Sequence, residues 1–370
     1  MKSKIRVGII FGGKSVEHEV SLQSAKNIFD AIDRDTYDVV LIGIDKKGQW
    51  HLNDAERFLQ RADNPKLIKL FDSADNLALV PGEKSNQVIR LKEQQSIGRI
   101  DVVFPILHGP FGEDGTIQGL LKLANVPFVG ASVLGSAVGM DKDVMKRLLR
   151  DAGIPIARFI TVNDVTRALY NFDSVVGAIG LPFFVKPANL GSSVGISRVS
   201  DAAEFERAVA DAFQYDTKVL YEQNIIGREI ECSVLGNLHP TASLPGEIIT
   251  NRDKHEFYSY EAKYIDEKGA SLQIPADVPE AVVARVQELA VKTFTALNCE
   301  GMARVDFFLT KNNELIVNEL NSIPGFTKIS MYPKLWEASG ISYCELIDKL
   351  LQLALERFER EQKLKTSVEL

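Results

Sequence analysis

Two apolar runs of strand length, separated by a segment with helical spacing, constrain the fold most strongly. The first run, Ile5–Phe11, ends at Gly12-Gly13. A predicted helix then runs from Ser15, its expected N-cap, to about Ile32, and Tyr37–Ile44 is the second run. A strand, a helix and a second strand in this order require a right-handed crossover and a parallel strand pair. The N-terminal part is therefore predicted to contain an open parallel sheet.

A glycine-rich loop follows the next apolar strand. Ile100–Leu107 runs into the segment His108-Gly109-Pro110-Phe111-Gly112-Glu113-Asp114-Gly115, which contains too much glycine for a helix or strand. Open α/β sheets bind ligands at the carboxyl ends of their strands, where this loop is expected. Residues 8–15 also match the letters of a P-loop. We reject that interpretation because Gly8 falls inside the strand, which leaves a loop of only four residues.

Length and composition limit the class of protein. At roughly 100–200 residues per domain, 370 residues predict two or three domains. The net charge of −7 argues against a general nucleic-acid binder. Three scattered cysteines without a CxxC pair fit a reducing compartment, and no apolar stretch reaches the roughly 20 residues of a membrane helix. A cytoplasmic location without a membrane partner is predicted.

The rest of the chain divides near Gly130. Helices are predicted at Asp141–Ala152, Ala281–Leu297 and Ser342–Gln362, and hairpins at 182–199 and 301–319. We expect irregular structure at 54–96. The predicted domains are an N-terminal substrate domain (1–130), a central subdomain (131–221) and a C-terminal subdomain with a metal site and a lid (222–370).

The most informative chemistry lies between residues 301 and 330. Arg304 and Asp306 share one face of a strand, and Glu319 and Asn321 repeat that spacing one hairpin away. Carboxylate and amide oxygens suit Mg²⁺ bound together with substrate phosphates. The alternative is a cross-strand salt bridge on a solvated face. Apolar residues between these positions indicate a sheet covered on its other face, which favours a site.

Three further segments suggest ligand contacts. Lys186 ends a strand before Asn189-Leu190-Gly191-Ser192-Ser193, which could cradle phosphates or be a surface hairpin. Glu222 and Glu229 could hold a nucleoside or be two surface glutamates. Residues 257–264 carry three tyrosines and a phenylalanine inside a long loop, which favours a closing lid over disorder.

Together these segments resemble the ATP-grasp superfamily, and within it the D-alanine–D-alanine ligases. The resemblance rests on ordered motifs along the whole chain, at residues 11–21, 108–119, 140–142, 185–195, 260–264, 304–306 and 318–327. It implies a mixed α/β and α+β ATP-grasp fold behind a Rossmann-like parallel-sheet domain. It also implies ATP-dependent joining of two D-alanines through a D-alanyl phosphate, in peptidoglycan precursor synthesis, by a homodimer.

The resemblance implies a role for each matching position. Residues that contact ATP would be Lys142, Lys186, Ser192, Ser193, Glu222, Glu229 and Lys263. Two Mg²⁺ ions, replaceable by Mn²⁺, would be held by Asp306, Glu319 and Asn321. The catalytic group would be Glu17, Ser192, Tyr264, Arg304 and Gly325. Substrate D-alanine would be contacted by Glu17, His108, Ser330 and Met331, the last two beside the second carboxylate.

Two alternatives stay open on sequence alone. One is a related ATP-grasp ligase, such as one that takes D-lactate as its second substrate. Residues 261–264, Glu-Ala-Lys-Tyr, favour the amine-using type. The other is a regulatory nucleotide-binding protein without turnover, which the complete set of lysines and metal ligands disfavours. A Rossmann dehydrogenase is weaker still, because the G-x-G-x-x-G fingerprint is missing after the first strand.

Overall fold

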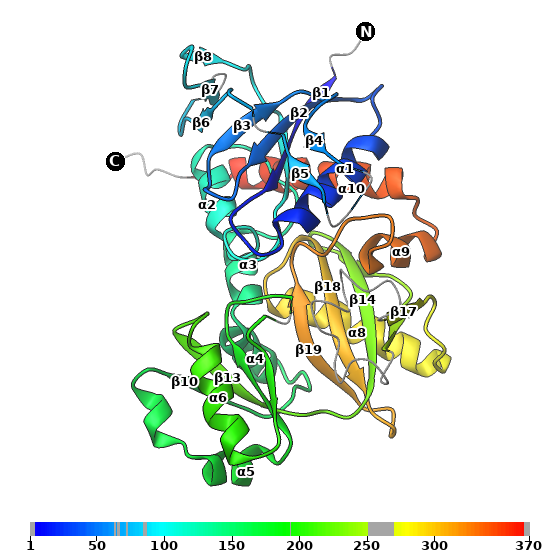
Figure 1. The fold of residues 1–370 in the computed structure, drawn as a ribbon. Coiled ribbons are helices and arrows are strands. Elements are labelled where there is room, and N and C mark those ends of the chain that lie inside the picture. The colour runs from blue at the N-terminus through cyan, green and yellow to red at the C-terminus, as the bar shows by residue number, and fades with distance from the viewer. Residues whose placement is uncertain are drawn as a thin grey trace.

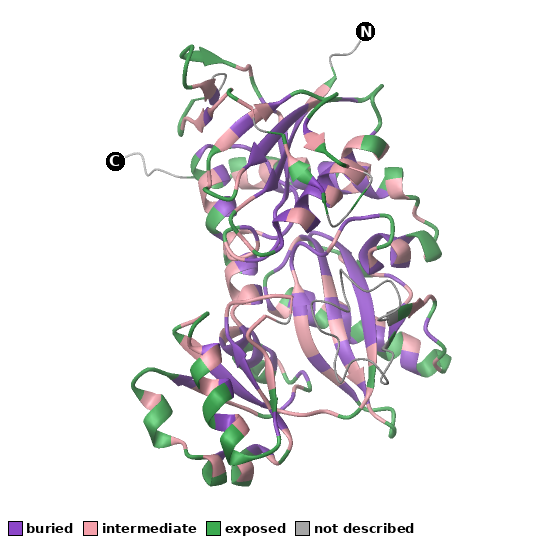
Figure 2. Ribbon diagram, viewed as in Figure 1, coloured by how far each residue is buried: buried purple, intermediate pink, exposed green. Residues whose placement is uncertain are grey.

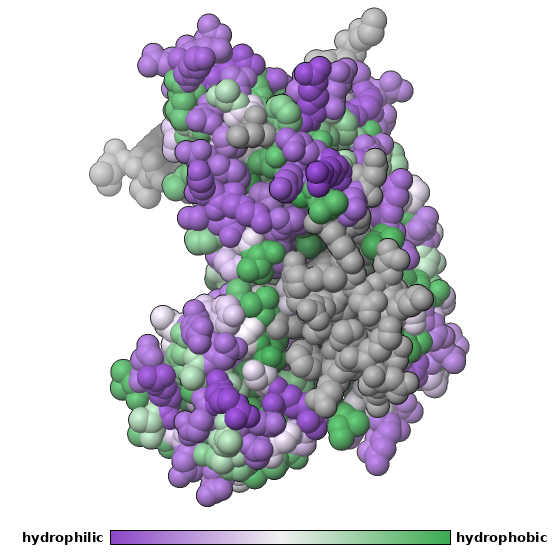
Figure 3. Space-filling view, viewed as in Figure 1, coloured by the Kyte–Doolittle hydropathy of each residue, from purple (hydrophilic) through white to green (hydrophobic). Residues whose placement is uncertain are grey.

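Three main sheets organise the chain into three lobes (Figure 1). The computed structural model describes residues 4–62, 64, 67–71, 73–83, 87–192, 194–250 and 270–365. Buried residues concentrate along the strands and exposed ones on the outer helices (Figure 2). The surface of the N-terminal lobe is predominantly hydrophilic in the view of Figure 3. Within the described ranges, no helix is long and apolar enough to cross a membrane.

The N-terminal sheet has the order β3-β2-β1-β9. Strands β1 (Ile5–Gly12), β2 (Tyr37–Ile44) and β9 (Val102–Ile106) are parallel, which confirms the predicted crossover, and β3 (Trp50–Asn53) pairs with β2 in antiparallel. Gly8 lies within β1, as expected when the P-loop was rejected. Five short strands occupy the segment expected to be irregular: β4 (Leu59–Gln60), β5 (Lys69–Leu70), β6 (Leu77–Leu79), β7 (Val88–Arg90) and β8 (Gln95–Ser96).

The start of the first helix differs from the sequence expectation. Helix α1 (His18–Ala31) begins at His18 with Glu17 as its N-cap, so the prediction of Ser15 in that position is wrong. The Ser15 hydroxyl instead donates to the carbonyl of His108 at 2.7 Å and accepts the Glu17 N–H at 3.1 Å. Ser15 therefore ties the turn after β1 to the glycine-rich loop after β9, which delays the helix.

The central lobe is an antiparallel sheet in the order β10-β13-β11-β12. The predicted hairpin at 182–199 forms, with a loop between its two strands. The strands are β10 (Phe159–Asn163), β11 (Phe183–Pro187), β12 (Ser197–Val199) and β13 (Lys218–Gln223). The helical segments between the first and second sheets and within this lobe are α2 (Thr116–Leu123), α3 (Val133–Met140), α4 (Lys142–Asp151), η1 (Thr166–Leu169), α5 (Phe172–Ile179) and α6 (Ala202–Ala212).

The C-terminal sheet runs β17-β16-β14-β18-β19, with β15 paired to β14. Helix α8 lies behind it in Figure 1. Its strands are β14 (Arg228–Gly236), β15 (Thr241–Ala242), β16 (Gly246–Thr250), β17 (Ala270–Gln273), β18 (Gly301–Leu309) and β19 (Leu315–Asn321). Its helices are α8 (Glu280–Ala296), α9 (Met331–Ala338) and α10 (Tyr343–Gln362).

Alternation along β18 separates a core face from a polar face. Ala303, Val305 and Phe307 are buried in one hydrophobic cluster with the apolar residues of α8. Because successive side chains of a strand point to opposite faces, Arg304 and Asp306 face away from that core. In β19, a register shift opposite Asp306/Phe307 skips one residue, so that Val317 and Leu320 both enter the core.

The last helix packs against the N-terminal sheet as well as against α9, its neighbour in sequence. Leu346, Leu350 and Leu351 of α10 belong to one buried cluster with β1 and β9 residues. The guanidinium of buried Arg357 donates to the carbonyls of Gly130 and Phe128, the latter at 2.7 Å. Ser342 begins α10 by accepting the Glu345 N–H at 3.3 Å. The helix thus links the two ends of the chain.

Truncating Leu350 to Ala should lower the free energy of unfolding by about 3 kcal/mol, because a fully buried side chain leaves a cavity between α10 and the sheet. Leu123→Ala, at a side chain that is 73% exposed, is the matched control and should change it by less than about 0.5 kcal/mol. Urea unfolding followed by circular dichroism measures both. Equal losses in the two variants would contradict the described packing of α10.

Candidate active site

The polar face of β18 and β19 gathers the residues predicted to bind a metal. Asp306 is directly opposite Glu319, and Arg304 is opposite Asn321. The amide of Asn321 donates to Asp306 Oδ2 at 2.9 Å. Arg304 holds both oxygens of Asp306, with Nε to Oδ1 at 2.7 Å and Nη2 to Oδ2 at 2.8 Å. The predicted convergence of these four side chains on one face is therefore found.

Arg304 also contacts a second carboxylate on the next strand. Its Nε lies 2.9 Å from Oε2 of Glu231 in β14, which is opposite Asp306 in the strand register. Glu231 is buried. Two acidic side chains therefore fix the guanidinium in place, and Arg304 presents a positive charge whose orientation is set before any ligand arrives.

Glu319 extends this cluster toward the lysines of the central lobe. Its Oε2 lies 3.9 Å from Nζ of Lys142, which begins α4. Lys142 also donates to the carbonyl of Leu190 at 2.7 Å, in the loop that follows Lys186. The predicted phosphate-binding segment is thus placed within reach of the predicted metal ligands.

A buried charge cluster lies deeper in the central lobe. Oε2 of Glu222 is 2.9 Å from Nζ of Lys186 and 3.2 Å from Nζ of Lys146. All three side chains are buried, so each charge depends on the others for compensation. Burial lowers the pKa of Lys146, which Glu222 opposes, while the two ammonium groups outweigh burial and keep the pKa of Glu222 below its ordinary value.

Glu17 connects the N-terminal helix with the loop that follows Lys186, described from Ala188 to Ser192 and called the phosphate loop below. The hydroxyl of Ser192 donates to Oε1 of Glu17, which brings together two members of the catalytic group that the resemblance implied. Gly109 also approaches this carboxylate. Its φ is +73°, and a Cβ at this position would lie 2.7 Å from Oε2 of Glu17. Any other residue would be strained there and would displace the carboxylate.

His108 is buried, and both of its ring nitrogens are engaged within the protein. Nδ1 is 3.0 Å from the carbonyl of Ile323, and Nε2 is 3.1 Å from Oγ of Ser24. A carbonyl can only accept, so Nδ1 carries the proton and Nε2 accepts from Ser24. Burial lowers the pKa of His108, consistent with a neutral ring. Its expected contact with substrate stays a prediction.

The turn after β19 positions the remaining substrate residues. The Thr327 N–H donates to Oγ of Ser330 at 3.0 Å. A Cβ on Gly325 would lie 3.0 Å from the same oxygen, so this turn is tight. Ser330 is the N-cap residue of α9. The side chain of Met331 is buried against Ile248 and Leu335, so it does not face a ligand. What this residue can offer to a carboxylate is its backbone N–H at the N-terminus of α9.

Some predicted residues are not placed. Ser193, Lys263 and Tyr264 lie outside the described residues, as does the whole segment 257–264 that was predicted to close as a lid. The long loop around this segment was expected to extend from about 251 to 273, but Ala270–Gln273 form strand β17, which pairs with β16. Glu229 is half-buried in β14, on the same face as Glu231. The proposed pairing of Glu229 with Glu222 around a nucleoside stays a prediction.

Sequence reasoning missed three charged residues of this site. Lys146 follows Lys142 by four positions, and Glu231 follows Glu229 by two, so helical and strand periodicity could have identified them. Glu113 lies in the glycine-rich loop. Its two oxygens accept the N–H groups of Gly109 at 2.8 Å and Ile323 at 2.9 Å, which joins two loops that each border the site.

The arrangement suits a polyphosphate with a divalent cation. Asp306, Glu319 and Asn321 supply oxygen donors, the type that Mg²⁺ prefers. Among the described residues, no group of three or more His, Cys, Asp or Glu side chains is placed to hold a metal ion, and this site itself offers two carboxylates and one amide. In this structure the two carboxylates face Arg304 and Lys142, so cations already balance them. Because all three donors are oxygens, they fit a hard divalent cation.

Comparisons with known proteins place both halves of the chain in one family. The family described as D-ala D-ala ligase N-terminus matches residues 6–131, and D-ala D-ala ligase C-terminus matches residues 148–352. A D-alanine--D-alanine ligase from Oceanobacillus iheyensis is 57% identical over 364 residues, which cover 98% of this chain and 99% of the relative. D-alanine--D-alanine ligase A from Escherichia coli K12 is 55% identical over 365 residues, which cover 99% and 100%.

Solved structures agree in fold. The D-alanine-D-alanine ligase from Coxiella burnetii gives a TM-score of 0.82 at 40% identity, over 97% of this chain and 98% of that chain. A D-Ala:D-Ser ligase from Enterococcus faecalis gives 0.84 at 34% identity, over 95% and 100%. Ligases with the same fold thus differ in the second substrate that their names give.

Glu113 should make stability depend on pH. Burial, reinforced by the negative charge of Glu17, raises its pKa from 4.5 to about 8. The folded state therefore favours the protonated acid. Its stabilising contribution is complete below pH 4.5 and is lost as the pH rises through 8.

The replacement Glu113→Gln should remove this dependence, because glutamine does not titrate. The free energy of unfolding of the parent protein, minus that of the variant, should therefore decrease as the pH rises from 4.5 to 8. Urea unfolding at a series of pH values measures the difference. Glu288→Gln, at an exposed residue of α8, serves as the control and should give a flat profile. A flat profile for Glu113→Gln as well would show that this carboxyl titrates normally.

Proposed function

The chain belongs to the D-alanine–D-alanine ligase family, and we propose that it joins two D-alanines to D-alanyl-D-alanine through a D-alanyl phosphate. Relatives at 55–58% identity over nearly the whole chain support the ligation and the ADP-forming ligase class. The expected ATP-grasp fold is confirmed by the likeness to solved ligases. ATP and a divalent cation follow from the family, and the product is a building block of peptidoglycan.

The observation that carries this proposal is the shared polar face of β18 and β19. Asp306, Glu319 and Asn321 lie together there, and Glu319 is 3.9 Å from Lys142. A divalent cation held by these donors would screen the charge of the phosphates when bound. We infer two Mg²⁺ ions, replaceable by Mn²⁺. Lys142 and Lys186 would contact the phosphates, with Ser193 closing over them and Lys263 near the γ-phosphate.

In the first step, a carboxylate oxygen of one D-alanine attacks the γ-phosphorus. The bond from that phosphorus to the β–γ bridging oxygen breaks, and ADP leaves. Glu17 would bind the ammonium group of this D-alanine, held in place by Ser192 and Tyr264. Orienting the carboxylate and neutralising phosphate charge are the main contributions of a protein to such a transfer.

In the second step, the free amine of the other D-alanine attacks the acyl carbon, loses a proton, and phosphate departs as the C–O bond breaks. The oxyanion formed would lie against Arg304 and the N–H of Gly325. Arg304 is suited to this role because Asp306 and Glu231 fix its orientation. Ser330 and the N-terminus of α9 would receive the second carboxylate.

Nucleotide and assembly roles complete the proposal. Glu222 and Glu229 would bind the adenine and the ribose, and buried Glu222 is held in place by Lys186.

We place the enzyme in the cytoplasm as a homodimer. Light scattering after size-exclusion chromatography measures the mass in solution, and a monomer would remove the dimer from the proposal.

A substrate panel tests the reaction. ATP with D-alanine alone should release phosphate and yield the dipeptide, whereas L-alanine should release little. The choice of second substrate is tested by adding D-lactate or D-serine to D-alanine, with products identified by mass spectrometry. Mixed products in place of D-alanyl-D-alanine would assign a related ligase activity. ATP-dependent heat stabilisation without any phosphate release would assign a regulatory nucleotide binder.

Arg304→Met should reduce dipeptide formation by about 10²–10³-fold, because the oxyanion loses a fixed positive charge. ATP binding, measured by calorimetry, should persist. Some loss of thermal stability is also expected, since Asp306 and Glu231 lose their shared partner. Arg285→Met, at an exposed arginine of α8, is the control and should retain full activity. Near-normal turnover of Arg304→Met would remove its proposed role.

A further inference from the structure

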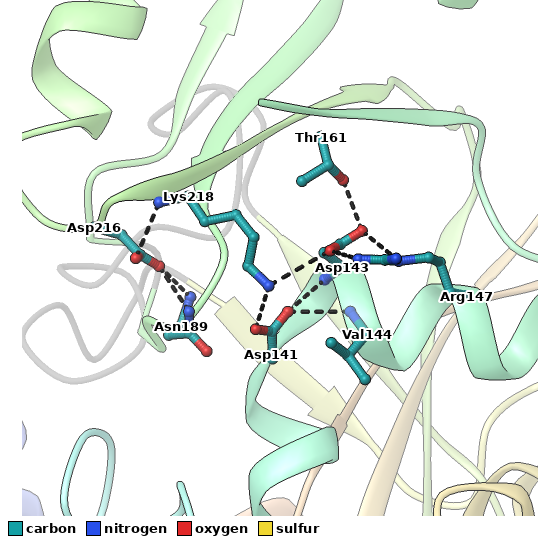
Figure 4. A network of polar contacts seen from close by, with 8 residues as sticks. All are labelled: Asp141, Asp143, Val144, Arg147, Thr161, Asn189, Asp216 and Lys218. Atoms are coloured by element: carbon teal, nitrogen blue, oxygen red, sulfur yellow. Dashed lines mark hydrogen bonds and ion pairs between the residues drawn. The ribbon is translucent and has the colours of Figure 1, made fainter. Parts of the chain in front are cut away.

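A network of charged side chains lies at the start of α4 (Figure 4). The reaction described above gives these residues no role. Nζ of Lys218, at the start of β13, lies 2.5 Å from Oδ2 of Asp141 and 3.4 Å from Oδ2 of Asp143. Asp143 is buried, and Lys218 and Asp141 are largely shielded. Partial burial makes these ion pairs less screened than surface pairs.

Both aspartates control the first turn of α4. Asp141 is its N-cap, and its Oδ1 accepts the N–H groups of Asp143 at 3.1 Å and Val144 at 3.0 Å. Asp143 accepts the hydroxyl of Thr161 at 2.8 Å. Lys142 lies between the two aspartates, and its own amino group reaches Leu190 and Glu319. The position of Lys142 therefore depends on how this turn is held.

The same strand end also holds the phosphate loop. Oδ2 of Asp216 accepts both the backbone N–H of Asn189 at 2.8 Å and its side-chain amide at 3.0 Å. The peptide groups of Ala188 bridge the two elements, because its N–H donates to the Lys218 carbonyl at 2.9 Å and its carbonyl accepts the Lys142 N–H at 3.0 Å. Loop, helix and strand thus meet at one point.

We propose that Lys218 is a positioning residue for ATP. Through Asp141 and Asp143, it fixes the position of Lys142 relative to the phosphate loop. This inference rests on the proposed function, since it concerns the same nucleotide. The ammonium of Lys218 contacts two carboxylates close to a site for a polyanion, and together with Arg147 it balances their charge. Without it, the helix start gains net negative charge beside the phosphates and loses its link to β13.

The test measures the Kd of ATP by calorimetry and the KM values for ATP and D-alanine, together with the Tm. Lys218→Met should weaken ATP binding by about five- to tenfold, the size expected for losing a partly buried ion pair. The KM for D-alanine should stay within roughly twofold. Lys218→Arg should restore ATP binding because it keeps the bridging charge.

Asp141→Asn is the second variant, and it separates the charge from the cap. Asparagine caps a helix as well as aspartate does, so the fold should be retained while the bond to Lys218 is lost. The double variant Lys218→Met/Asp141→Asn should bind ATP no more weakly than Lys218→Met alone, because that single change already removes the ion pair with Asp141. Arg147→Met removes the other cation of Asp143 from an exposed position but keeps the link of Lys218 to both aspartates, so it should change the Kd of ATP by less than about twofold.

An unchanged Kd of ATP in Lys218→Met, with only a lower Tm, would overturn the inference and leave Lys218 a structural role. Failure of Lys218→Arg to recover ATP binding would also overturn it. Should Lys218→Met not fold, an unchanged Kd of ATP in Asp141→Asn decides against the inference. Failure of the proposed function is distinguishable, because it would appear as absent ligation by the parent protein.

Discussion

The packing of α8 against one face of β14, β18 and β19 is the constraint on which the site depends. Alternate residues of each strand enter that core, so the residues between them must face the opposite way. The register shift opposite Asp306 keeps this separation where a regular β19 would reverse it. The apolar core thus decides where the carboxylates and the guanidinium of the site lie.

Opposite charges hold the side chains of two clusters in place, one on the polar face of β18 and one in the central lobe. Arg304 is shared by Asp306 and Glu231, and Glu222 by Lys146 and Lys186. Isolated buried charges would be costly, so these groups are compensated as sets. A nucleotide with its cation would exchange partners within such sets and would find side chains already oriented. This preorganisation costs less on binding than ordering flexible groups.

Sequence patterns predicted the elements well where periodicity was strong. The crossover of β1 and β2 and helices α4, α8 and α10 are confirmed within one or two residues, and the hairpin of β11 and β12 is confirmed with a second strand that begins three residues later than expected. Period two predicted that Arg304 and Asp306 share a face and that Glu319 and Asn321 share one, while the register shift that brings the two pairs together was not visible in the sequence. The start of α1 was missed because the Ser15 hydroxyl bonds to His108, a contact across 93 residues. Glu113 and Lys218 were missed for the same reason: their partners come from distant segments, which local periodicity does not reveal.

The position of α10 has a consequence for the order of synthesis. A ribosome makes the N-terminal strands first, yet the apolar surface of β1 and β9 is covered by residues near position 350. The N-terminal lobe therefore cannot complete its interior until nearly the whole polypeptide has emerged. During translation that half-formed sheet must stay soluble for most of the synthesis time, which makes the nascent chain a natural client for protection against aggregation.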